Sequence, residues 1–211
     1  DDETVYIPKA YWDLTTPKAL TMEYIHGIKI SELEQLQAAG IDRKTIALNV
    51  AEFILNEIFQ FHCFLADPHP GNIFVLENNV IAPVDFGMIG MLDEEIVCQL
   101  GVLFTAIVKK DADTLANFFL SVNLAPEPIN RRAFRMELTD FLERCYGLHL
   151  RQLIIKSIID DLMGLARRYR LWFPPELVMM AKALVMYQGV GTMLYPEFNF
   201  FSLGQIPHHL R

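Results

Sequence analysis

The stretch that decides the fold of this 211-residue chain is Phe61–Leu92, FHCFLADPHPGNIFVLENNVIAPVDFGMIGML. It contains two acidic motifs, Asp67-Pro-His-Pro-Gly-Asn72 and Asp85-Phe86-Gly87. Between the motifs, two β-rich runs flank the polar turn Glu77-Asn78-Asn79, a pattern that predicts a β-hairpin. Because antiparallel pairing brings the ends of a hairpin together, we expect the carboxylates and the amide of the two motifs to share one rim.

A cluster of carboxylate and amide oxygens suits a magnesium–triphosphate site, because Mg²⁺ prefers oxygen ligands and leaves coordination positions for phosphate and water. Protein kinases build such a site from an Asp, an Asn five residues later and the Asp of a D-F-G sequence. Asp67 and Asn72 have this spacing, and Asp85 opens a D-F-G. The spacing alone is a weak signal, and an ordinary hairpin with an Asp cap is the alternative. The D-F-G in its hairpin context makes the combination specific.

Four segments of the chain resemble one known family. A-D-P-H-P-G-N at 66–72 and D-F-G-M-I-G-x-L-D at 85–93 resemble the UbiB/AarF family of atypical, protein-kinase-like proteins, and so do L-T-M-E-Y-I-H-G at 20–27 and Y-P-E-F-N at 195–199. The resemblance covers nearly the whole chain. It implies the C-terminal lobe of a protein-kinase-like fold, mainly α-helical with a small β-hairpin, and a link to ubiquinone and other isoprenoid-lipid metabolism.

The resemblance also implies an ATP-binding hinge in the segment Met22-Glu23-Tyr24-Ile25. Met22 would be the gatekeeper, the Glu23 carbonyl would accept a hydrogen bond from the adenine amine, and the Ile25 amide would donate one to the adenine ring. The alternative is an edge strand that runs into a loop at Gly27.

The same resemblance assigns roles in the loop. Asn72 and Asp85 would hold Mg²⁺, and Asp67 would orient or deprotonate the attacking hydroxyl or water. His69 stands where many kinases have a Lys that touches the transferred phosphate, so it either donates a hydrogen bond there or is a rigid loop residue between two prolines. Leu65 and Ala66 replace the usual His-Arg, which argues against control by activation-loop phosphorylation.

Helix signals surround this loop. Ser31–Glu34 reads as a capping box for a short helix that ends at Gly40, and Asp42 as the N-cap of a long helix to about Phe64. Asp93 reads as a helix N-cap soon after D-F-G, so we expect an activation segment of only a few residues. Ala125-Pro126-Glu127 is then a connector and not the end of that segment. Apolar periodicity predicts helices near 94–110, 112–121, 131–147, 151–170 and 175–194, and strands are expected at 5–7 and 19–22.

The expected organisation is one kinase-like C-lobe over residues 1–211. It comprises the end of the N-lobe and the hinge (1–27), the core helices with the catalytic loop and D-F-G hairpin (28–92), and a helical part (93–211). The chain contains no G-x-G-x-x-G, V-A-I-K-like or Lys-x-Gly-Gln sequence. We therefore expect that the N-lobe is missing, that it is a partner from the same protein, and that this fragment alone is inactive.

Composition narrows the function further. The net charge of −8 argues against a nucleic-acid surface, and three cysteines without C-x-x-C spacing indicate a reducing compartment. The hydrophobic fraction of 52% indicates either a bare lobe interface or closeness to a membrane. Apolar runs at 96–108 and 177–194 read as buried core helices. The expected location is cytoplasmic or membrane-peripheral: the inner face of a bacterial membrane, or a mitochondrial or plastid membrane.

These observations predict a Mg²⁺- and ATP-dependent atypical kinase or ATPase that acts on water or on a small or lipid-like acceptor. The expected partners are a nucleotide, an isoprenoid lipid or quinone-biosynthesis proteins. The alternative is a non-catalytic scaffold or nucleotide sensor for a lipid-biosynthesis complex.

Overall fold

The computed structural model describes residues 3–124, 129–147 and 155–200, so the expected connector at 125–127 and the start of the helix expected at 151 lie outside the description. The described chain is mainly helical with small antiparallel sheets, as predicted. Its helices are α1 (Leu33–Ala38), α2 (Arg43–Phe59), α3 (Glu94–Lys109), α4 (Ala112–Ser121), α5 (Arg131–Gly147), α6 (Ile155–Arg168) and α7 (Pro175–Leu194). Its strands are β1 (Ile28–Lys29), β2 (Cys63–Leu65), β3 (Ile73–Val75), β4 (Ile81–Pro83) and β5 (Ile89–Met91).

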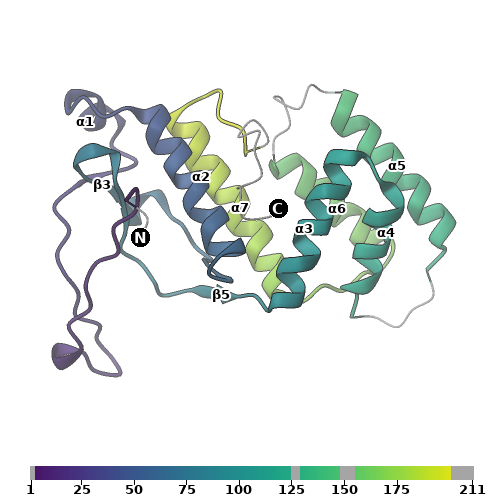
Figure 1. Ribbon diagram of the computed structural model, residues 1–211, viewed down its shortest axis with the longest axis horizontal. Coiled ribbons are helices and arrows are strands. Elements are labelled where there is room, and N and C mark those ends of the chain that lie inside the picture. Colours follow the sequence, from purple (N-terminus) through teal and green to yellow (C-terminus); the bar gives the residue numbers. More distant parts are fainter. Residues whose placement is uncertain (1–2, 125–128, 148–154, 201–211) are drawn as a thin grey trace.

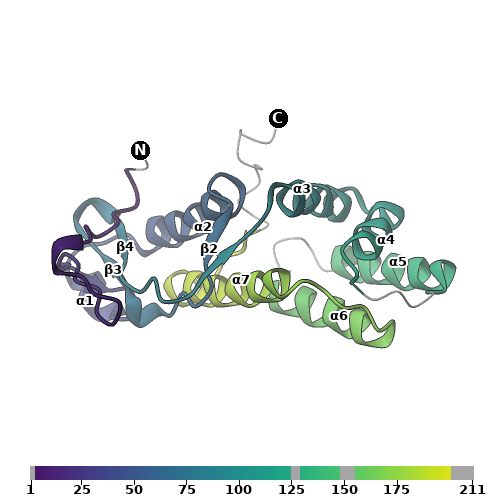
Figure 2. The same cartoon turned by 90° about the horizontal axis from the view of Figure 1, so that it is seen from below.

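The molecule is elongated, with the β-hairpin at one end and helices α3 to α6 at the other (Figure 1). Helices α2 and α7 lie side by side between the two ends (Figures 1 and 2). Their interface buries apolar side chains from both helices, and the ring of Phe53 meets that of Tyr187 edge-on at 6.4 Å. By length and composition α7 could cross a membrane, but it packs here as a core helix, as expected for residues 177–194.

The predicted hairpin is present. β3 and β4 pair antiparallel with Ile73 opposite Pro83, and β1 pairs with the other edge of β3. The polar turn is a short 3₁₀ segment in which Asn78 and Asn79 have φ of 59° and 62°. Asparagine tolerates this left-handed region better than most residues, so the turn sequence specifies the reversal.

The helix expected to run to Phe64 ends at Phe59, and this part of the prediction is wrong. His62 has a φ of 54°, which turns the chain, and Cys63–Leu65 then form β2. β2 pairs antiparallel with β5, the strand directly after D-F-G. The apolar spacing of the helix continues through these residues, but the strand partner overrides it. The second sheet therefore holds the chain just before Asp67 and just after Gly87.

Two other predictions at the N-terminal end are wrong. Residues 5–7 and 19–22 contribute only isolated bridges, because neither segment has a partner strand along its length in the described chain. These bridges join Val5 to Ile81, Ala10 to Met22 and Thr16 to Ala19. The short helix α1 starts after Glu32, without a side-chain cap, so the Ser31 capping box does not form.

The helix caps predicted at Asp42 and Asp93 are confirmed. Asp42 accepts from the Lys44 amide at the start of α2, and Asp93 accepts from the Ile96 amide, at 2.7 Å, at the start of α3. Asn130 accepts from the Ala133 amide at the start of α5. Helices α3, α4, α5 and α7 match the expected segments within a residue, and α6 lies inside its expected segment. Because α3 follows Asp93 directly, only the six residues 88–93 separate α3 from Gly87.

Candidate functional site

The two acidic motifs meet where the hairpin begins and ends. Asn72 comes directly before β3 and Asp85 closely follows β4. The Asn72 Nδ2 donates to Asp85 Oδ2 at 2.8 Å, and the Val84 amide donates to the Asn72 carbonyl at 2.9 Å. Asp85 Oδ1 accepts from the Gly87 amide at 3.0 Å, which fixes the carboxylate against the D-F-G turn. The fold thus brings the two expected metal ligands into direct contact.

Asp67 opens the loop that leads to Asn72. Its carbonyl accepts from the His69 amide at 2.8 Å, and the His69 carbonyl accepts from the Asn72 amide at 2.9 Å. Behind it, the Ala66 amide donates to the Met88 carbonyl, which anchors the start of the loop to the chain after D-F-G. The Asp67 side chain is exposed and has no hydrogen-bond partner among the described residues. Its carboxylate is therefore open to a ligand while its backbone is held.

His69 turns back onto its own loop. Its Nδ1 accepts from the Gly71 amide at 3.0 Å, capping the 3₁₀ turn Pro70–Asn72. An accepting Nδ1 carries no proton, so the neutral ring has its hydrogen on Nε2. This contact fits the rigid-loop interpretation of His69 and leaves Nε2–H as a donor.

The expected hinge, Met22–Ile25, lies in the segment that precedes β1. The carboxylate of Glu23 accepts from the Tyr6 hydroxyl at 2.7 Å and from the Lys9 amide at 3.2 Å, and these hydrogen bonds lower the pKa of Glu23. The exposed Tyr24 ring contacts its neighbour His26. Within the described residues no hydrogen bond uses the Glu23 carbonyl or the Ile25 amide, the two backbone groups that a hinge would offer to adenine.

Sequence reasoning missed Glu57, a buried carboxylate under the loop. Its side chain lies on α2 and is 8% exposed, and its Oε2 accepts from the Leu65 amide at 3.3 Å and from the Tyr187 hydroxyl at 3.2 Å. Burial raises the pKa of Glu57 to about 7, and burial together with Glu57 raises the pKa of the nearby Cys63 thiol. The signal in the sequence was an acidic residue at helical spacing from the apolar positions Val50 and Ile54.

The raised pKa of Glu57 gives a stability prediction. The folded chain holds this proton more tightly than the unfolded chain, whose Glu pKa is about 4.5. The contribution of Glu57 to the free energy of unfolding is therefore complete below about pH 4.5. This contribution falls by about 3 kcal/mol as the pH rises to about 7. Urea unfolding at pH 5 and pH 8 measures this change. The difference between wild type and Glu57→Gln isolates Glu57 from the other carboxylates, and equal pH dependence in both proteins would contradict it.

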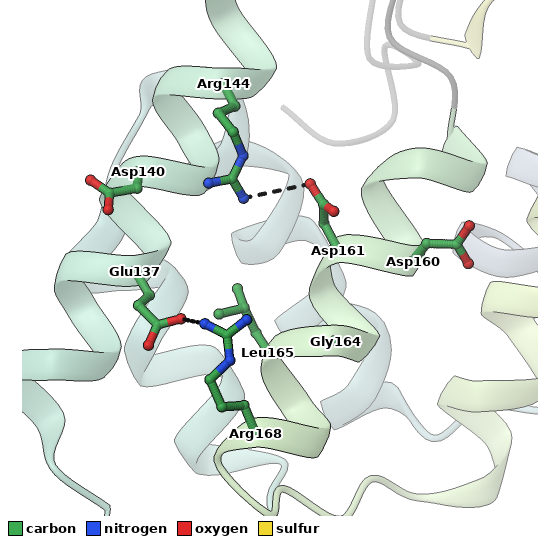
Figure 3. A pocket seen from close by; sticks show the side chains of 8 residues that line it. All are labelled: Glu137, Asp140, Arg144, Asp160, Asp161, Gly164, Leu165 and Arg168. Carbon is green, nitrogen blue, oxygen red and sulfur yellow. Dashed lines mark hydrogen bonds and ion pairs between the residues drawn. The ribbon is translucent and has the colours of Figure 1, made fainter.

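A cavity of about 310 Å³ lies elsewhere, between α5 and α6. Figure 3 shows Arg168 directed at Glu137 and Arg144 directed at Asp161, the latter pair at 3.6 Å, whereas Asp140 and Asp160 point outwards. The cavity is lined by Glu137, Asp140, Arg144, Asp160, Asp161, Gly164, Leu165 and Arg168. Both arginines are exposed and each is paired with a carboxylate of the neighbouring helix, so these ion pairs join α5 to α6.

A mainly helical lobe in which an Asp-x4-Asn loop meets a D-F-G hairpin defines the larger lobe of a protein-kinase-like fold. The chain belongs to the ABC1 atypical kinase-like family: the ABC1 atypical kinase-like domain matches residues 1–119, and the UbiB helical domain matches residues 138–199. This confirms the family resemblance found in the sequence.

Relatives in the same family include three proteins named "Probable protein kinase UbiB". The one from Pseudomonas paraeruginosa is 31% identical over 205 residues, covering 95% of this chain. Those from Pseudomonas putida and Histophilus somni are 30% and 29% identical over 206 residues, covering 96%. The chain spans 38% of the length of each of these relatives.

A solved structure has the same fold. The structure of Rv3197 from Mycobacterium tuberculosis, described as a complex with erythromycin, superposes with a TM-score of 0.63 and is 18% identical in sequence. The match covers 92% of this chain and 50% of that chain.

Proposed function

We propose that this chain is the large lobe of an atypical kinase or ATPase of the UbiB type, which uses Mg²⁺ and ATP. Its activity would be phosphoryl transfer or ATP hydrolysis linked to ubiquinone or other isoprenoid-lipid metabolism. The observation that carries the proposal is the contact between Asn72 and Asp85 at 2.8 Å beside the Asp67 loop. Family membership supports the kinase-like class.

The contact between Asn72 and Asp85 fits a magnesium site. An octahedral ion with bonds of 2.0–2.1 Å holds neighbouring ligand atoms about 2.9 Å apart, close to the observed separation. Turning the Asn72 amide over exchanges Nδ2 for Oδ1 and presents two oxygens. The metal when bound would neutralise charge on the phosphates.

Asp67 would act on the attacking group. Its carboxylate is exposed and unpaired within the described chain, and the backbone hydrogen bonds of its loop fix its position. A carboxylate held in this way can orient a hydroxyl or water and accept its proton. His69, with Nδ1 occupied by the Gly71 amide, would contribute Nε2–H as a donor to phosphate.

The acceptor would be water or a small or lipid-like molecule. The chain after Gly87 enters β5, which is paired with β2, and reaches the α3 cap at Asp93 within a few residues. This leaves no loop of the length that kinases use to hold a peptide. Adenine would bind at Met22–Ile25, and an N-lobe would supply the lysine for the phosphates. The protein would work in the cytoplasm or beside a membrane.

The test uses the parent protein, meaning the longest form that carries this chain. We expect Asp67→Asn to lower ATP turnover at least about a hundredfold, because a positioned base contributes 10²–10⁴-fold. Mg²⁺–nucleotide affinity, measured by calorimetry, should stay within about threefold. Wild type that binds Mg²⁺–nucleotide but never turns over would favour a sensor or scaffold. Asp67-dependent phosphorylation of a protein substrate would contradict the proposed acceptor class.

A further inference from the structure

One buried carboxylate joins three separate parts of the structure. Glu57 lies on α2, and its Oε2 accepts from Leu65 on β2 and from Tyr187 on α7. Within the described residues it forms no ion pair. Burying a carboxyl group without a cationic partner is costly, so such groups are rare in protein interiors. The contacts of Glu57 therefore suggest a role beyond filling the core.

The contact with Glu57 satisfies the Leu65 amide of β2, the strand that leads into the loop. Among the described residues β2 has one partner strand, β5, and the neighbouring Ala66 amide donates to the carbonyl of Met88, the residue just before β5. Successive amides of a strand point to opposite edges, so the Leu65 N–H points away from β5. Glu57 accepts from the Leu65 amide there, on the edge that no strand of the described chain covers. Asp67 follows two residues later.

The contact with Tyr187 comes from the other family domain. Tyr187 is fully buried on α7, inside the match to the UbiB helical domain, whereas Glu57 and Leu65 lie inside the match to the ABC1 domain. The ring of Phe53 packs edge-on against the Tyr187 ring, whose hydroxyl donates to Glu57. Figure 2 shows α2 and α7 side by side, with β2 close to them.

We propose that Glu57 is a positioning residue through which Tyr187 of the helical domain sets the backbone ahead of Asp67. The inference rests on the proposed role of Asp67. A shift of α7 against α2 then changes the geometry of the catalytic loop without touching nucleotide. Misplacing a catalytic group by about 1 Å can cost on the order of 10²-fold in rate, so a modest contact has a large effect.

The first test separates positioning from binding in the parent protein. Tyr187→Phe removes only the hydroxyl, and Glu57→Leu removes the acceptor for both donors. We expect kcat for ATP, per molecule of nucleotide-binding protein, to fall about threefold to tenfold in Tyr187→Phe and at least about tenfold in Glu57→Leu. KM for ATP should stay within about twofold. Glu57→Gln keeps an accepting oxygen and should restore kcat to within about threefold of wild type.

The chain offers a matched control for the tyrosine variant. The Tyr169 hydroxyl donates to Glu137 Oε1 at 2.8 Å, a second tyrosine–glutamate pair that does not touch the loop. Tyr169→Phe should leave kcat unchanged. The proposal is overturned if Glu57→Leu turns over like wild type, or if Tyr169→Phe lowers kcat as much as Tyr187→Phe. Should Glu57→Leu fail to fold, Tyr187→Phe decides.

A second readout does not depend on activity. Hydrogen exchange of the peptide that covers residues 63–67 should be at least about tenfold faster in Tyr187→Phe than in wild type, because the Glu57–Leu65 contact loosens. Exchange in α6 should not change. A parent protein without turnover would overturn the proposed function, while this exchange still decides the positioning role. Unchanged exchange at 63–67 would overturn the positioning role alone.

Discussion

Replacing Asp85 with Asn in the parent protein is expected to lower ATP turnover at least about a hundredfold and to remove the Mg²⁺ dependence of nucleotide binding. Asn keeps the shape of the side chain and can still accept from the Gly87 amide, so the D-F-G turn should remain. It lacks the negative charge that a hard cation requires, and the remaining amides bind Mg²⁺ weakly. Steady-state turnover and calorimetry with and without Mg²⁺ measure both effects.

Asp93→Asn is the matched control for this charge change. Asp93 lies eight residues later and caps α3 through the Ile96 amide, and Asn caps helices as well as Asp does. The control variant should turn over and bind as wild type. Turnover by Asp85→Asn with wild-type Mg²⁺ dependence would rule out Asp85 as a metal ligand.

Gly90→Ala is expected to destabilise the protein by about 2–3 kcal/mol, as overpacking of a filled core does. Gly90 lies on β5 opposite Phe64, and a Cβ there would sit 2.2 Å from the Cζ of the Phe64 ring. The ring is fully buried and cannot move without displacing its neighbours. Because the β2–β5 pair holds both acidic motifs, turnover in the parent protein should fall as well. Urea unfolding gives the change in stability.

Gly101→Ala is the control for Gly90. A Cβ at Gly101 would meet no atom within 4 Å, and the residue lies inside α3. Alanine in a helix interior is favoured over glycine, so this variant should gain about 0.5–1 kcal/mol. A Gly90→Ala protein as stable as wild type would show that β5 does not pack tightly on Phe64.

Much of the architecture was predictable because the relevant signals are local. The Asn78-Asn79 turn specifies the hairpin, and Asp42, Asp93 and Asn130 each cap the helix that the apolar spacing predicts. The contact between Asn72 and Asp85 follows from the hairpin alone, because a hairpin returns the chain to its starting point.

The rest depends on partners distant in sequence. Phe61 and Phe64 continue the apolar spacing of α2, so nothing local shows that the helix ends at Phe59; the strand partner at Ile89–Met91 decides it. Tyr187 and Glu57 are 130 residues apart, and their contact exists only once α7 packs on α2. Sequence periodicity marks both positions as buried but does not pair them.

The expected functional residues and the helix that supports them lie in different parts of the chain. The residues with expected chemical roles lie within the match to the ABC1 domain, in loops and a 3₁₀ turn next to short strands. The UbiB helical domain contributes α7, which packs against α2. Rigid support of this kind is what a site built on loops requires to hold its geometry.

The most direct test of the central claim is the position of the metal. Crystals of the parent protein with Mn²⁺ and a non-hydrolysable ATP analogue would reveal the ion by its anomalous scattering, since Mn²⁺ takes the same oxygen ligands as Mg²⁺. We predict a peak bonded to an oxygen of Asn72 and an oxygen of Asp85, with phosphate oxygens completing the shell. Bound nucleotide whose metal lies away from both side chains would contradict the account.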